Sequence, residues 1–175
     1  MYEIKKFEPR LYQKNILLTT KDNNTLVCLP TGTGKTKSAV LLAIERLNKI
    51  PESKVLICTP TKPLSNQICE EFKESTNITS SEINLLTGML SPKVRKISWD
   101  NSKVIVATPQ TIKNDIESGR IDLSNVSMLC IDECHRSKYK FANTVVAKYY
   151  KEQSKNPRIL ALTASPGATK DKIDL

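Results

Sequence analysis

Short runs of apolar residues alternate with longer amphipathic segments along the chain. Six runs are continuously apolar and rich in β-branched residues, as strands buried on both faces are: 25–29, 54–58, 82–86, 103–107, 127–131 and 158–162. Between them lie segments with helical periodicity, at about 63–73, 108–118 and 139–153, and a shorter one precedes the first run at about 9–18. The alternation predicts an α/β domain with an open, mainly parallel sheet and helices on both of its faces.

The best-marked helix begins at Thr36, directly after a glycine-containing loop. Its apolar residues recur at helical spacing, and Pro51 lies just beyond its expected end. Gly119 marks a C-terminal stop for the segment at 108–118. We find no internal repeat, low-complexity tract or Pro/Gly-rich linker. Residues 1–175 are therefore expected to form a single domain.

The loop after the first predicted strand has the composition of a phosphate-binding loop. In an open α/β sheet, ligands bind at the carboxyl ends of the strands. Gly32 and Gly34 permit backbone conformations that aim N–H groups at phosphate oxygens, and the following helix directs its positive end there. Leu29 occupies a position that is glycine in the usual pattern. Nucleotide binding is expected from Pro30, Thr31, Gly32, Thr33, Gly34, Lys35 and Thr36, with Lys35 at the β/γ-phosphates and Thr36 on Mg²⁺.

A second group of chemically active residues follows the fifth predicted strand. Asp132 comes directly after a buried run and is expected to hold Mg²⁺ directly or through water. Glu133 is the candidate base that orients and deprotonates the attacking water, a role that hydrolysis requires and transfer to a bound substrate does not. His135, the one histidine in the chain, stands beside this pair. The two groups together predict a nucleotide hydrolase with Lys35, Asp132, Glu133 and His135 in its catalytic site.

The net charge limits the classes of partner to be considered, and the positions of the cysteines indicate the redox state of the compartment. The chain carries 27 Lys+Arg against 18 Asp+Glu, a formal charge of +9, which favours nucleic acid or an anionic membrane surface. Cys28, Cys58 and Cys130 lie inside apolar runs, where cysteine acts as a small buried hydrophobe. Zinc binding by Cys130, Cys134 and His135 lacks a second Cys/His pair at a suitable spacing. With no signal peptide or membrane-length run, we expect a reduced, cytoplasmic protein.

The sequence Asp132-Glu133-Cys134-His135 resembles the DExH signature of superfamily 2 helicases, and other motifs of their first motor domain follow in order. The resemblance implies a RecA-like fold of the P-loop NTPase class. It also implies adenine recognition by Arg10 and Gln13, and coupling of ATP state to nucleic-acid grip by Thr163 and Ser165. Residues implied in nucleic-acid contact are Thr61, Lys62, Thr87, Gly88, Thr108, Gln110 and Thr111. Singly these are weak signals, because Thr, Pro and Gly also cap helices and form turns.

Two longer segments, 60–64 and 104–115, closely resemble archaeal Hef helicases, in the group that also holds Dicer, the RIG-I-like receptors and the FANCM fork enzymes. Cys134 departs from the alanine expected in Hef. The resemblance implies an ATP-driven translocase on forked or branched DNA in repair of stalled replication. An RNA helicase, or a nucleotide-dependent module that grips double-stranded RNA, remains the alternative, because contacts to phosphate do not distinguish the two nucleic acids.

The family's motor has two such domains, with ATP between them and arginine fingers on the second. We therefore expect this chain to be a fragment that needs a second RecA-like domain in cis and is nearly inactive alone as an ATPase. A small-molecule kinase is the competing enzyme class. It would need an acceptor pocket and a mobile arginine-bearing lid, and the sequence shows evidence of neither.

Overall fold

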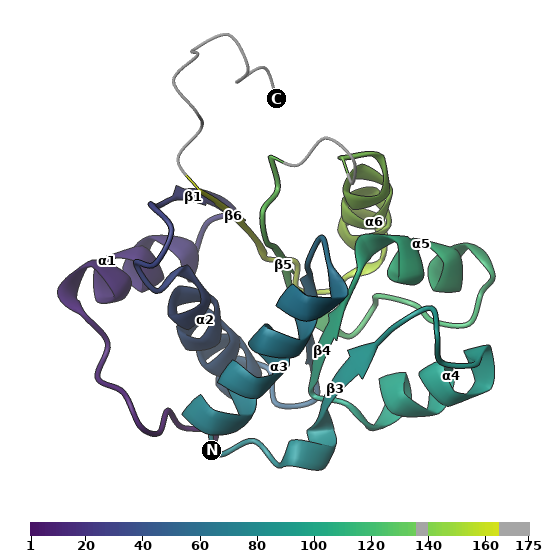
Figure 1. The fold of residues 1–175 in the computed structure, drawn as a ribbon, viewed down its shortest axis with the longest axis horizontal. Helices are drawn as coiled ribbons and strands as arrows, with labels where there is room; N and C mark the ends of the chain where they lie inside the picture. Colours follow the sequence, from purple (N-terminus) through teal and green to yellow (C-terminus); the bar gives the residue numbers. More distant parts are fainter. Residues whose placement is uncertain (136–139, 165–175) are drawn as a thin grey trace, which may run out of the picture.

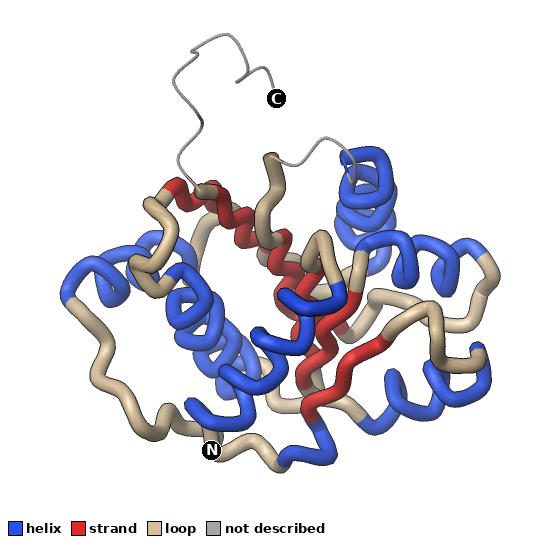
Figure 2. Tube along the Cα trace, viewed as in Figure 1, coloured by secondary structure: helices blue, strands red, loops and turns tan. Residues whose placement is uncertain are grey.

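The computed structural model describes residues 1–135 and 140–164. Its centre is a sheet of six strands, and every pair of neighbours in it is parallel (Figures 1 and 2). The spatial order is β1-β6-β5-β2-β4-β3. The strands are β1 Thr25–Cys28, β2 Lys54–Cys58, β3 Ile83–Leu86, β4 Val104–Ala107, β5 Val126–Ile131 and β6 Ile159–Thr163. All six predicted strands are confirmed, with ends that differ by at most one residue.

Helices cover both faces of the sheet, as predicted (Figure 1). One face packs against α1 (Leu11–Thr20), α2 (Lys35–Lys49) and α3 (Lys62–Ser75). The other packs against α4 (Pro92–Asn101), α5 (Pro109–Glu117) and α6 (Lys140–Gln153). A 3₁₀ turn, η1 (Ser80–Glu82), precedes β3. The predicted start of the last helix, Tyr139, lies outside the described residues.

The central strand β2 explains why the apolar runs are continuous rather than alternating. Val55 and Ile57 enter the core beneath α2 and α3, whereas Leu56 and Cys58 enter the core on the opposite face. All four side chains are at most 1% exposed. Burying a large aliphatic side chain stabilises the fold by roughly 1.5–3 kcal/mol, so a strand covered on both sides gains from every residue.

Helix α4 was not predicted. Its apolar residues give little periodicity, because Val94 and Ile97 are exposed and Trp99 is the one large apolar side chain of the helix in the core. The local signal is its start: the Ser91 hydroxyl accepts a hydrogen bond from the Val94 N–H, and Pro92 occupies the first turn. At the other end of the neighbouring helix, Gly119 has φ 70° and follows the last residues of α5, as predicted.

The prediction that Cys28 is buried was wrong. β1 is an edge strand of the described sheet, and α2 covers only one of its faces, so Val27 is buried while Cys28 is exposed. Cys58 and Cys130 are buried as predicted, and burial raises the pKa of the Cys58 thiol to about 12. No helix in the described ranges is long and apolar enough to cross a membrane.

Candidate functional site

The strand order divides the candidate residues into two neighbouring groups at one edge of the sheet. Strands β1, β6 and β5 are adjacent, and at their carboxyl ends lie the glycine-rich loop, Thr163 and the Asp132–His135 turn. Strands β2, β4 and β3 are adjacent too, and beyond their carboxyl ends lie Thr61, Thr108 and Thr87. The residues of the two groups alternate along the sequence, so it is the strand order of the sheet that separates them in space. After the roles predicted for their residues, we call them the nucleotide half and the nucleic-acid half of the edge.

The glycine-rich loop joins β1 to α2 and has the backbone geometry that its sequence predicts. Gly32 and Gly34 have φ values of 81° and 85°, in the left-handed region. Gly34 is the N-cap of α2, and Lys35 is the first residue of that helix. Both the N–H and the hydroxyl of Thr33 donate to the Pro30 carbonyl, at 3.4 and 2.7 Å, which closes the loop. The loop therefore presents a helix N-terminus, where backbone N–H groups have no partner within the helix and favour an anion.

A chain of polar contacts joins the three strand ends of the nucleotide half. Lys35 Nζ lies 3.5 Å from Glu133 Oε1, and the other carboxylate oxygen lies 3.5 Å from His135 Nδ1. His135 Nδ1 is also 2.6 Å from Thr163 Oγ1. The side chains of Lys35 and Glu133 are only 11% and 18% exposed. Four predicted residues, separated by up to 128 positions in the sequence from Lys35 to Thr163, thus lie in one connected group.

The hydrogen bonds around His135 match one tautomer of its ring. The Thr163 hydroxyl donates to the Ala164 carbonyl at 2.8 Å, so its oxygen accepts from His135. In the tautomer that matches these contacts, Nδ1 of His135 carries the ring proton and lies 3.5 Å from the Glu133 carboxylate. Ser165, the other predicted coupling residue, lies outside the described residues.

The turn that carries Glu133 is strained. Glu133 has φ 51°, a left-handed conformation that non-glycine residues rarely adopt. Asp132 Oδ1 accepts the Glu133 N–H at 3.0 Å, and the Asp132 N–H donates to the Cys58 carbonyl of β2. The Cys134 N–H donates to the Leu162 carbonyl of β6. Bonds to strands on both sides of β5 hold the turn in its conformation, and backbone strain of this kind concentrates at functional sites.

Helix α1 closes the other side of the glycine-rich loop. Gln13 Nε2 donates to the Gly34 carbonyl at 3.2 Å, Gln13 Oε1 accepts from the Arg10 N–H, and the Tyr12 hydroxyl donates to the Thr33 carbonyl. Gln13 is only 2% exposed. Beside these contacts is a hollow of about 210 Å³, lined by Phe7, Glu8, Arg10, Gln13, Gly32, Thr33, Gly34 and Lys37. The predicted adenine-recognition residues thus border a cavity that adjoins the loop.

Sequence reasoning gave no role to three residues around this hollow, Phe7, Tyr12 and Lys37. Phe7 lies on its wall, with the Lys37 ammonium 4.5 Å from the centre of the Phe7 ring. Tyr12 holds the loop from α1. Tyr12 lies between Arg10 and Gln13 in the sequence, so its place beside the predicted adenine site could have been inferred. Phe7 and Lys37 are brought together only by the fold, and the sequence gives no sign of their contact.

The nucleic-acid half presents hydroxyl and backbone groups at helix starts. Thr61 is the N-cap of α3 and Thr108 the N-cap of α5. Lys62 is exposed, with its ammonium 3.1 Å from Met89 Sδ in the turn that follows Thr87 and Gly88. Gln110 is exposed and bonds Asn114, but Thr111 is only 7% exposed and its hydroxyl bonds Thr108. Thr111 therefore lies beneath the surface, where it orients the hydroxyl of Thr108.

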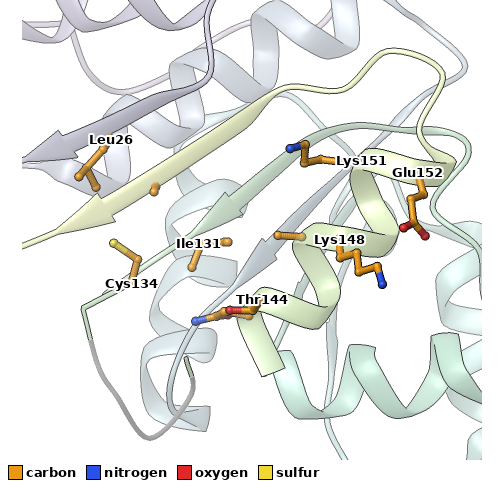
Figure 3. A pocket seen from close by; sticks show the side chains of 10 residues that line it. Leu26, Ile131, Cys134, Thr144, Lys148, Lys151 and Glu152 are labelled. Atoms are coloured by element: carbon orange, nitrogen blue, oxygen red, sulfur yellow. The ribbon is translucent and has the colours of Figure 1, made fainter. Parts of the chain in front are cut away.

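A larger hollow lies on the face of the sheet and reaches the nucleotide half at Cys134. It has a volume of about 630 Å³ and is an apolar groove between α6 and the open face of β1 and β6 (Figure 3). Leu26, Ile131 and Ala161 line the sheet side, and Cys134 lies at one end. Burial raises the pKa of the Cys134 thiol, which disfavours the thiolate form that metal binding requires. Among the described residues, no group of three or more His, Cys, Asp and Glu is placed to hold a metal ion.

Comparison with known proteins gives matches over almost the whole chain. The family model described as "DEAD/DEAH box helicase" matches residues 10–173. The solved helicase domain of Hef from Pyrococcus furiosus is 48% identical, with a TM-score of 0.88 over 94% of this chain and 35% of that one. The UvsW helicase of bacteriophage T4 is 26% identical, with a TM-score of 0.69 over 91% of this chain and 53% of that one.

Curated relatives are similar over the same span. The ATP-dependent DNA helicase MPH1 of Scheffersomyces stipitis is 39% identical over 95% of this chain and 16% of its own length. A protein of Methanocaldococcus jannaschii that carries the name of an ATP-dependent RNA helicase is 40% identical over 97% of this chain and 21% of its own. The chain thus spans about a sixth to a fifth of the length of these relatives.

Proposed function

The chain belongs to the DEAD/DEAH box helicase family, and we propose that it is the first motor domain of an ATP-driven translocase acting on forked or branched DNA. The observation that carries the proposal is the sorting of the strand ends. A nucleotide half and a nucleic-acid half share one edge of one rigid sheet, and they meet where β5 adjoins β2. A change at one half can therefore be transmitted directly to the other.

In the nucleotide half, the loop from Pro30 to Thr36 binds the phosphates through its N–H groups. Lys35 neutralises the β/γ-phosphates, an exchange in which the ammonium leaves Glu133, its partner at 3.5 Å, for phosphate oxygens. The Thr36 hydroxyl and the Asp132 carboxylate are oxygen donors that fit Mg²⁺, which takes few protein ligands when phosphates and water supply the rest. The bound ion would neutralise charge on the phosphates.

Glu133 is the proposed general base. Once Lys35 has turned to the phosphates, the Glu133 carboxylate is available to orient the attacking water and take its proton. His135 stays beside Glu133 and donates Nδ1–H to Thr163 on β6. The contact gives the turn after β5 a discrete hydrogen-bonded state that can differ between ATP-bound and ATP-free protein, as coupling requires.

The hollow beside the loop is the proposed site of the adenine base. Gln13 and Arg10 lie on its wall, and the Gln13 amide already spans from the Arg10 N–H to the Gly34 carbonyl. An adenine base that bonds Gln13 would therefore be linked to the phosphate-binding loop through a single side chain.

The substrate and the second domain are drawn from the relatives. MPH1 is named a DNA helicase and Hef is 48% identical over nearly all of this chain, which favours DNA over the RNA alternative. Thr61, Lys62, Thr87, Gly88, Thr108 and Gln110 contact the sugar-phosphate backbone in this proposal, with Thr111 supporting Thr108. A second RecA-like domain in cis supplies the arginine that completes the ATP site, so residues 1–175 alone hydrolyse ATP about 10³-fold or more slowly.

The test is stimulation of ATP hydrolysis by the full-length protein. Forked DNA and duplex RNA of equal length are compared at equal salt, because phosphate contacts make both affinities salt-dependent. We expect forked DNA to give the larger stimulation. An equal or larger effect of RNA would overturn the DNA assignment, and no stimulation by either would overturn the motor itself.

A further inference from the structure

A buried cluster of charges lies beneath the nucleic-acid half. Arg95 of α4 donates from Nε and Nη2 to the two carboxylate oxygens of Asp115 on α5, both at 2.7 Å. Arg120 donates to the same carboxylate at 2.7 Å. The side chains of Arg95 and Asp115 are 8% and 1% exposed. Burial opposes ionisation of Asp115, but hydrogen bonds from Arg95 and Arg120 outweigh it, so the pKa of Asp115 lies below its usual range.

A contribution to core packing does not by itself explain why charged side chains are buried here. A buried ion pair is costly to desolvate, and apolar side chains of similar volume often stabilise a fold equally well. Its geometric effect is more specific, because a guanidinium and a carboxylate that bond in two places fix the relative position of the segments that carry them.

The segments that the cluster joins are the two loops at the ends of β3 and β4. Arg95 Nη1 donates to the Leu90 carbonyl at 2.5 Å, and the Leu90 N–H donates to the Thr87 carbonyl, so Arg95 holds the turn that carries Thr87 and Gly88. Asp115 belongs to the helix that Thr108 caps. The last paired residues of the two strands are Leu86 and Ala107, which places Thr87 and Thr108 side by side.

We propose that Arg95 and Asp115 are positioning residues that set the spacing of the Thr87–Gly88 turn and the Thr108 helix start on the nucleic-acid backbone. The inference rests on the proposed function, because it assumes that these two loops bind the backbone. Both side chains are buried, so they act through the loops without contacting nucleic acid themselves. Arg95 is suited to this role because its planar group can bond Asp115 twice and Leu90 once, which a lysine ammonium cannot do in that geometry.

The first test is Arg95→Lys in the full-length protein, which keeps the charge and removes the planar fork. We expect affinity for forked DNA to fall about tenfold. This is the effect of losing one or two neutral hydrogen bonds to the DNA backbone when the loops are displaced. The slope of affinity against salt should stay unchanged, because no phosphate-binding charge is lost. Mg-ATP affinity should also stay unchanged. Lys96→Met is the matched control on the same helix, because it breaks an exposed pair with Asp100 and should leave DNA affinity as it was.

A second variant separates positioning from mere stability. The double substitution Arg95→Met and Asp115→Leu replaces the pair with apolar side chains, which can preserve the fold while removing the tie to Leu90. We expect a variant with near-normal thermal unfolding and weakened DNA binding. A stably folded Arg95→Lys or double variant with wild-type DNA affinity would overturn the proposal. If the double variant does not fold, Arg95→Lys decides.

A direct-contact variant distinguishes this failure from failure of the proposed function. Lys62→Ala removes an exposed charge that the proposed function places on phosphate, so it should weaken DNA binding and reduce the salt slope. If Lys62→Ala acts and the Arg95 variants do not, the positioning role alone is wrong. If Lys62→Ala also has no effect, the assignment of this edge to nucleic acid is wrong.

Discussion

The two halves of the carboxyl edge are held in opposite ways. In the nucleotide half, Lys35, Glu133 and His135 are linked by polar contacts of 3.5 Å, long enough for Lys35 and Glu133 to change partner. In the nucleic-acid half, Arg95 and Asp115 are joined by two bonds of 2.7 Å in the interior. Under the proposed function, the difference means that the half where chemistry occurs can rearrange, whereas the half that binds the regular nucleic-acid backbone keeps its spacing.

The comparison is tested most severely by Glu133→Gln in the full-length protein. We expect ATP turnover to fall by about 10²–10⁴-fold, the usual contribution of a general base. Mg-ATP affinity and thermal stability should change little, because the amide is isosteric and the contacts that it loses are long. The measurements are steady-state ATPase, titration calorimetry and thermal unfolding, with the exposed Glu70→Gln as control. Undiminished turnover would remove Glu133 from the role of base.

Asp115→Ala should give the opposite result, a large loss of stability. Removing one partner leaves two guanidinium groups facing an empty site, and breaking a buried pair costs about 3–5 kcal/mol in unfolding free energy. Denaturant unfolding of the 175-residue chain measures it. Asp100→Ala is the control, because its pair with Lys96 is exposed and contributes at most about 1 kcal/mol. Equal losses of unfolding free energy for the two variants would show that the buried cluster does not hold the nucleic-acid half in place.

Lys35→Ala should act on nucleotide binding. Loss of its charged contacts to phosphate is expected to weaken Mg-ATP about 10–100-fold. The loss of stability should be smaller than for Asp115→Ala, because the contact from Lys35 to Glu133 is long, at 3.5 Å. Calorimetry checks both expectations against Lys49→Ala, at the far, exposed end of α2. Equal ATP affinity for Lys35→Ala and the wild type would contradict the assignment.

A pair of glycine substitutions gives the smallest and most local comparison. Gly34→Ala forces a left-handed alanine and places its Cβ 3.0 Å from Gln13 Nε2, so it should cost about 1–3 kcal/mol and weaken ATP binding. A Cβ at Gly88 has no neighbour within 4 Å, and Gly88→Ala should leave stability nearly unchanged. Thermal unfolding of both variants tests this, and a costly Gly88→Ala would reveal a constraint in the nucleic-acid half that the structure lacks.

The sequence predicted the nucleotide half better than the nucleic-acid half. Glycines, a lysine at a helix start and acids after an apolar run have few other uses in combination, so Gly34, Lys35 and Glu133 could be placed before the fold was known. The positions of Thr61, Thr87 and Thr108 also followed from strand ends. Arg95 and Asp115 could not be found, because α4 has weak periodicity and a buried pair between two helices leaves no local pattern. Cys28 was misjudged because an apolar run does not reveal whether its strand is at the edge of a sheet.

The left-handed conformation of Glu133 has a consequence for engineering. Glycine would adopt φ 51° without strain, so Glu133→Gly should recover up to about 1 kcal/mol of unfolding free energy after its own entropic cost is counted. A laboratory selection for heat resistance alone would therefore favour a protein that has lost its proposed base. Thermal stability and activity therefore conflict at this residue, and any screen for more stable variants of the domain must measure ATP turnover as well as melting temperature.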